Sequence, residues 1–164
     1  MDRHSKEPYM ISSIDGTATS RPIAYATLTI GGDNVPSIYW NTYFGFAPTI
    51  FVEKGNFFVT PSGKPSRSLG RTNVWGYSTR DIIHDDFVAP HLKHLIEKFR
   101  LPRIALKSFI EANDLRFYVS CYWWNPERNR IPMIPPEHET IFRQSGGGIF
   151  IDEYPCEINM DENI

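Results

Sequence analysis

Cysteine is scarce in this 164-residue chain, which contains only Cys121 and Cys156. Two cysteines are too few for a disulfide framework, and no Cys-X-X-Cys pair or Cys/His cluster indicates structural zinc. A chain of this length buries enough surface to fold without either kind of crosslink. We therefore expect two thiols in a reducing compartment, with Cys121 on the inward face of a strand.

Long apolar segments are also missing. No run approaches the roughly 18 residues that predict a transmembrane helix. Residues 1–20 carry three acidic side chains and no stretch that resembles a signal peptide. The hydrophobic content of 41% and the charged content of 22% are ordinary for a globular domain. The sequence thus predicts a soluble, cytoplasmic protein with no membrane partner.

The net charge of −2 conceals an uneven distribution. Residues 54–80 carry five basic side chains and no acid, whereas residues 152–164 carry five acids and no base. Without that acidic segment, the remainder of the chain has a net charge of +3. We expect a flexible N-terminal arm at 1–22, one domain at 23–154 and an acidic C-terminal tail at 155–164.

Apolar and polar side chains alternate in several segments, which is the pattern of half-buried β-strands. In residues 23–30, Ala24, Ala26, Leu28 and Ile30 share one face, and tyrosine and threonine occupy the other. Alternation also marks 71–79 and 115–123. Further strands are expected from β-rich composition at 49–52, 57–60 and 148–154. The strands at 49–52 and 57–60 could form a hairpin or one bent strand.

The clearest helix is predicted at 87–100, where apolar residues recur at helical spacing and form one stripe. Pro102 should end it and begin a second helix that extends to about 112. Shorter helices are expected at 36–44 and 136–144. These elements predict an α+β single-domain sandwich with a mostly antiparallel sheet and helices packed on one face, in the approximate order β-α-β-β-α-β-α-β.

Catalytic motifs are absent from the sequence. It has no Gly-X-Ser-X-Gly elbow and no His-Glu-X-X-His pair, and the glycines at 146–148 lead out of a helix, which indicates a turn and not a phosphate loop. We therefore expect no enzymatic activity, no cofactor and no metal. A metal-dependent enzyme built around His84, Asp85 and His91 is kept as an alternative.

Arginine and aromatic residues concentrate at two strand-to-loop junctions, which is the composition of protein-interface hot spots and of base-stacking platforms. The competing interpretation places Trp75 and Trp123 in the core and the arginines in solvent. As a hypothesis, the partner-binding residues are Arg67, Arg71, Trp75, Tyr77, Arg80, Trp124 and Arg128.

Several short motifs follow one another in a familiar order: residues 25–33, 45–49, 54–55, 75–78, 115–121 with Trp123, and a glycine-led strand that ends at Tyr154. In this order the chain resembles, over about residues 24–154, the bacterial family described as domain of unknown function 4279. The resemblance implies a small bacterial α+β protein without a transferable catalytic motif. It also implies that some members serve as immunity proteins beside secreted toxins. The aromatic segment at 36–44, the loop at 61–70 and the acidic tail depart from the family pattern.

Three functional hypotheses follow. The first is a non-enzymatic binding protein, an immunity protein that neutralises a cognate toxin by direct contact. The second is a nucleic-acid or nucleotide-binding module that uses the basic, aromatic region 64–80, against which the acidic tail counts because phosphates repel it. The third is the metal-dependent enzyme described above. Oligomeric state is left open by the sequence.

Overall fold

The structure, a computed structural model, describes residues 22–155. The predicted arm and tail lie outside the described residues, apart from Pro22 and Pro155. The elements, in chain order, are β1 (Ala24–Gly31), α1 (Ile38–Phe44), β2 (Ile50–Val52), β3 (Val74–Ser78), α2 (Val88–Phe99), α3 (Ile104–Ala112), β4 (Arg116–Trp124), α4 (Pro136–Gln144) and β5 (Gly148–Tyr154).

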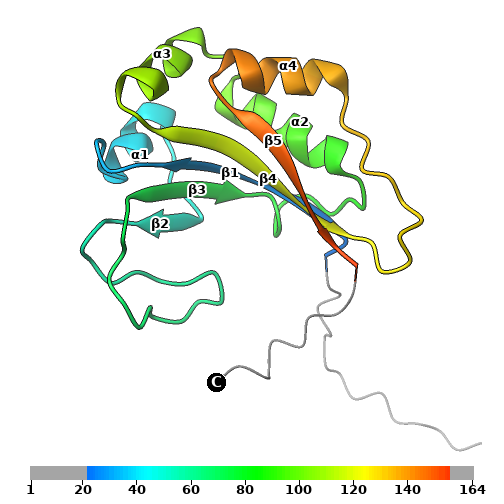
Figure 1. Cartoon of the computed structure of the whole chain (residues 1–164), viewed down its shortest axis with the longest axis horizontal. Helices are drawn as coiled ribbons and strands as arrows, with labels where there is room; N and C mark the ends of the chain where they lie inside the picture. Colours follow the sequence, from blue (N-terminus) through cyan, green and yellow to red (C-terminus); the bar gives the residue numbers. More distant parts are fainter. Residues whose placement is uncertain (1–21, 156–164) are drawn as a thin grey trace, which may run out of the picture.

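The strands form one five-stranded sheet in the order β2-β3-β1-β4-β5, and the helices all lie on the same side of it (Figure 1). Three of the four strand pairs are antiparallel, and β4 pairs with β5 in parallel. A parallel pair requires a crossover, which α4 supplies between β4 and β5. The predicted α+β fold with helices on one face is confirmed.

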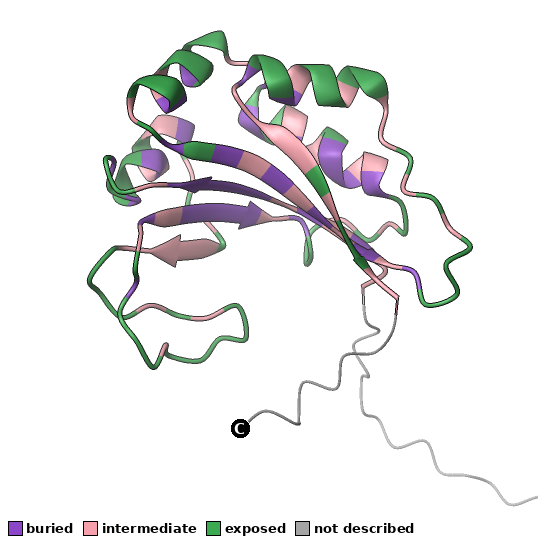
Figure 2. Ribbon diagram, viewed as in Figure 1, coloured by how far each residue is buried: buried purple, intermediate pink, exposed green. Residues whose placement is uncertain are grey.

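The core lies between the sheet and the helices. Alternate residues of β1 and β4 are buried, such as Leu28 and Val119, and the predicted stripe of α2 packs against them through Leu92, Leu95 and Phe99. Burial therefore alternates along β4 and along the first half of β1 (Figure 2). Apolar side chains on this face are the main source of stability, because each fully buried one contributes about 1.5–3 kcal/mol.

An aromatic cluster fills the core beneath α1. The ring centroids of Phe44 and Phe99 lie 4.8 Å apart, and those of Phe44 and Trp75 lie 5.2 Å apart. The helix that brings Phe44 into this cluster ends as its sequence predicts, since Gly45 adopts a φ of 80° that favours glycine. The aromatic content of 36–44 is therefore largely a packing feature.

One predicted strand is wrong. Residues 57–60 do not form a strand. The 53–73 segment is a long loop whose β-type pairing is limited to isolated bridges between Lys54 and Gly70 and between Val59 and Pro65. Phe57 and Val59 have β propensity, yet they are 68% and 65% exposed, so no buried face holds them in a sheet. Two residues in the left-handed region, Gly55 and Gly63, interrupt the segment.

Candidate functional site: the open face of the sheet

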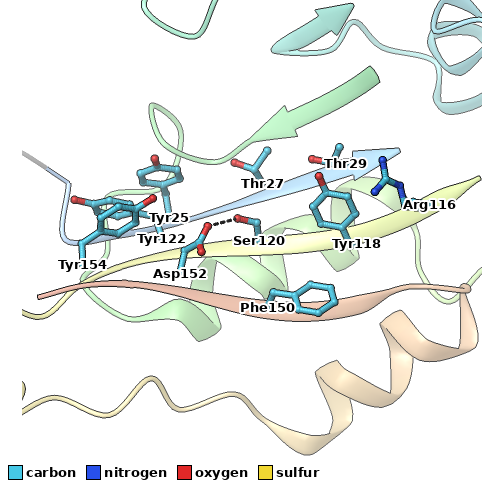
Figure 3. Close-up of a pocket in the computed structure, with 10 residues that line it drawn as sticks. All are labelled: Tyr25, Thr27, Thr29, Arg116, Tyr118, Ser120, Tyr122, Phe150, Asp152 and Tyr154. Atoms are coloured by element: carbon cyan, nitrogen blue, oxygen red, sulfur yellow. Dashed lines mark hydrogen bonds between the residues drawn. The ribbon is translucent and has the colours of Figure 1, made fainter. Parts of the chain in front are cut away.

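The face of the sheet opposite the helices carries no further layer of described residues (Figure 1). Side chains of β1, β4 and β5 line a pocket of about 600 Å³ on this face. We call this surface the open face (Figure 3); its pocket is lined by Tyr25, Thr27, Thr29, Arg116, Tyr118, Ser120, Tyr122, Phe150, Asp152 and Tyr154. These residues gather because alternate positions of neighbouring strands point to the same side.

Three tyrosines stack across the strands at one end of the open face. Tyr25 pairs with Tyr122 in the β1–β4 register, and their ring centroids are 4.7 Å apart with planes inclined by 9°. The Tyr122 and Tyr154 rings follow at 4.8 Å and 30°. The Arg80 guanidinium lies 5.7 Å from the Tyr25 centroid. Burial raises the pKa of Tyr25 above its ordinary value, despite the opposing effect of Arg80.

The remainder of the open face is polar but nearly balanced in charge. The Ser120 hydroxyl donates a hydrogen bond to Asp152 Oδ2 at 3.3 Å, and Thr27 donates to Ser78 Oγ at 3.2 Å. Among the ten residues that line the pocket, Arg116 is the one cation and Asp152 the one anion. Such a surface offers stacking, hydrogen bonds and a modest electric field to a ligand.

Two residues expected at a binding surface, Trp75 and Tyr77, belong to the core instead. Trp75 is 0% exposed and Tyr77 is 8% exposed. Trp75 Nε1 donates a hydrogen bond to Asn41 Oδ1 at 2.9 Å, so its polar group is satisfied inside the protein. Both side chains point toward the helices because they alternate with Val74, Gly76 and Ser78 along β3. This placement corrects the expectation and agrees with the competing core interpretation.

The other expected residues are distributed over several places. Arg67 and Arg71 are exposed on the 53–73 loop, and Arg128 is exposed on the loop after β4. Arg80 lies beside the tyrosine stack. Trp124 is half-buried and pairs with Tyr154 in the β4–β5 register, which puts it at the same end of the sheet. Only Arg80 and Trp124 are therefore associated with the open face.

Sequence reasoning missed most of the open face. The sequence feature that marks the open face is the polar set of alternate residues in each strand, where Tyr25, Tyr118 and Tyr122 occur among threonine and serine. The alternation shows that these residues share a face within one strand, but it does not show which strands are neighbours. Phe150, Asp152 and Tyr154 join the site only because β5 pairs with β4.

The structure does not support the alternative of a metal site around His84, Asp85 and His91, because the described part of the chain contains no metal-binding geometry. His91 is buried, its Nε2 donates to the Asp85 carbonyl oxygen at 2.9 Å, and its Nδ1 accepts from the Thr79 hydroxyl at 2.6 Å. His84 is exposed. No group of three or more His, Cys, Asp or Glu side chains suited to a metal occurs among residues 22–155. His91 thus connects α2 to the end of β3, and burial lowers its pKa.

Cys121 is fully buried on the helix-covered side of β4, as the alternation predicts. Burial raises the pKa of its thiol to about 12, which disfavours the reactive thiolate. Cys156 lies outside the described residues. Cys121 is accordingly a small core side chain.

Comparison with known proteins adds no relative. No protein-family model, curated protein or solved structure matches this chain. The fold and the site define the class: an α+β domain with one helix-covered and one open, tyrosine-rich sheet face. Within residues 22–155, no helix has the length and apolar character needed to cross a membrane.

Proposed function

We propose that this chain is a binding protein that holds a partner protein against the open face, and that the partner is a cognate toxin which it neutralises. The observation that carries the binding function is the tyrosine-, serine- and threonine-rich pocket on an uncovered sheet. Antibody paratopes use the same side chains, because tyrosine supplies a large, rigid contact with a polar end. The toxin is suggested by the resemblance to the family with immunity proteins.

The size of the surface suits a protein partner. A tyrosine or phenylalanine can bury about 150–250 Å², and a standard interface buries about 800 Å² on each partner. The open face offers Tyr25, Tyr118, Tyr122, Tyr154 and Phe150, which are half-buried or exposed before any partner binds. Because four of these rings are already partly buried, they supply only part of an ordinary interface, and the neighbouring polar side chains of the open face must supply the rest.

Co-expression with the product of the adjacent gene tests the proposal. If that product is the toxin, this chain should restore growth and form a complex that survives size-exclusion chromatography. Failure of every neighbouring gene product to form a complex would contradict the toxin assignment.

Matched arginine variants then locate the surface. Arg116→Ala removes a cation from the open face, whereas Arg143→Ala removes an exposed cation at the end of α4 on the helix side. We expect the first to weaken toxin binding about tenfold, since interfacial arginines often contribute more than 1 kcal/mol, and the second to leave it unchanged. If Arg67→Ala or Arg71→Ala abolishes binding while Arg116→Ala does not, the partner binds the 53–73 loop and not the open face.

Single-stranded nucleic acid is a second candidate ligand. Aromatic rings on an open antiparallel sheet are the arrangement with which some RNA-binding domains stack bases. The near balance of Arg116 and Asp152 argues against strong phosphate binding. Fluorescence anisotropy with labelled oligonucleotides at low salt decides the matter, because phosphate contacts are strongest there; absence of binding removes this candidate.

A further inference from the structure

The two edges of the sheet differ in length and protection. One edge is β2, which has three residues, and the other is β5, which has seven. Among the described strands, β5 pairs only with β4. Exposed edges invite pairing with other chains, so natural proteins usually shorten them or guard them with lysine, proline or bulges. The sequence of β5, Gly-Ile-Phe-Ile-Asp-Glu-Tyr, has neither lysine nor proline, and its charged side chains, Asp152 and Glu153, stand in its second half, so Gly148–Ile151 carries no such guard.

Backbone directions along β5 follow from one hydrogen bond. Asn125 N donates to the Tyr154 carbonyl oxygen at 3.1 Å, so the backbone groups of Tyr154 point toward β4. Since direction alternates along a strand, the groups of Ile149, Ile151 and Glu153 point away from the sheet. No described residue makes a hydrogen bond to these three N–H and three C=O groups. Within residues 22–155 these groups form a regular row without hydrogen-bond partners.

We propose that β5 pairs with β5 of a second copy of this chain, in antiparallel orientation about a twofold axis at Ile151. In this register Ile151 faces the partner's Ile151, and Ile149 faces the partner's Glu153. Each of the three outward residues then exchanges two hydrogen bonds, so all six groups are satisfied. The result is a continuous ten-stranded sheet with C2 symmetry, the commonest symmetry of homo-oligomers.

The side chains of β5 complement one another in this register. On the open face, Phe150 lies opposite the partner's Asp152, and Tyr154 lies opposite the partner's Gly148. A large ring beside an edge glycine is a stabilising cross-strand pair, and neither acid of one copy faces an acid of the other directly. Self-pairing thus satisfies both the backbone and the side chains, which is why a second copy is the occupant that we favour.

The pairing joins two open faces into one surface. Phe150 and Tyr154 lie on the strand nearest the axis, so the aromatic pockets of the two copies become neighbours across the new β5 pair. The inference concerns self-association and holds whatever partner the open face binds. It can therefore fail while the proposed function stands, and the reverse is also true.

Two variants that introduce opposite charges at one exposed position test the proposed β5–β5 register. Phe150 is 61% exposed, so its replacement should perturb the monomer little. Phe150→Asp places an acid opposite the partner's Asp152 twice, whereas Phe150→Lys places a base there twice. We expect sedimentation velocity over a concentration series to show a dimer for the full chain and for Phe150→Lys. The dimer dissociation constant of Phe150→Asp should be at least about tenfold higher than that of Phe150→Lys.

Amide hydrogen exchange supplies a readout that does not depend on any substitution. The N–H groups of Ile149, Ile151 and Glu153 should gain protection as concentration rises, whereas those of Phe150 and Asp152, which face β4, should be protected throughout. The proposal is overturned if the full-length chain remains monomeric over a 100-fold range of protein concentration. Protection of the three outward amides in dilute monomer also overturns it, because another segment of the same chain would then cover the edge.

Discussion

The two faces of the sheet are built from the same strands but from different side chains. Along β4, Phe117, Val119 and Cys121 point into the helix layer and are buried, whereas Tyr118 and Ser120 between them point to the open face and remain partly exposed. The covered face is chosen for apolar volume. The open face carries rings with polar ends, which tolerate contact with water, so the buried core and the candidate binding surface are separated by one residue of alternation.

The largest effect should come from removing a ring on the covered face. Phe99 is 0% exposed and contacts Phe44, Phe46, Trp75 and Tyr77. Phe99→Ala should lower the free energy of unfolding by about 3–5 kcal/mol because it removes apolar contact and leaves a cavity. Urea denaturation measures the change. A loss below 1 kcal/mol would mean that the cluster is not a packed core.

Removing a ring from the open face should cost less. Tyr122 stacks with Tyr25 and Tyr154 but is partly exposed. Aromatic pairs contribute about 0.5–1.5 kcal/mol each, so Tyr122→Ala should lower the free energy of unfolding by about 1–2 kcal/mol. The same urea titration applies. A loss as large as that of Phe99→Ala would erase the distinction between the faces.

The pH dependence of stability probes a buried titratable residue on the covered side, His91. Burial lowers the pKa of His91 below 6.5, so the unfolded chain binds a proton there more readily than the folded chain. Stability should be full above pH 6.5 and should fall as the pH decreases, with a contribution of up to about 1.4 kcal/mol per pH unit. His91→Gln should flatten this part of the profile relative to the unsubstituted chain. An identical slope in the two proteins would show that groups other than His91 govern the pH response.

The smallest effect should come from a polar pair on the open face. Ser120→Ala removes the 3.3 Å hydrogen bond to Asp152, which is exposed to water. Water can replace the lost donor, so the free energy of unfolding should change by less than about 0.5 kcal/mol. The matched change on the covered side is Thr79→Ala, which leaves the His91 ring nitrogen without its donor and should cost about 1–3 kcal/mol. Equal effects in the two variants would contradict the comparison.

The fold was largely predictable because its signals are local. Period-two alternation found β1 and β4, and the stripe through Leu92, Leu95 and Phe99 found α2. Residues 57–60 were misassigned because β propensity acts only where a partner strand and a buried face exist, and the exposed Phe57 and Val59 have neither. Propensity is a local quantity, and pairing is not.

The candidate site was less predictable for the same reason. Arginine–tryptophan composition selected Trp75, whose position in the alternation of β3 turns it inward. The tyrosines of the open face come from β1, β4 and β5, and their proximity depends on strand order and register, which no single segment encodes. The sequence shows which residues share a face within one strand, and only the folded sheet shows which strands bring these residues into contact.

The tyrosine stack has a consequence for how the protein is made. Tyr25 belongs to the first strand of the described domain and Tyr154 to the last, with Tyr122 between them in space. Pairing segments so distant in sequence is slow compared with forming local helices. A chain still being synthesised therefore lacks the surface until β5 has been added and docked. The assembled tyrosine stack therefore forms only in a chain whose sheet is complete, and under the proposed function only such a chain presents the binding surface.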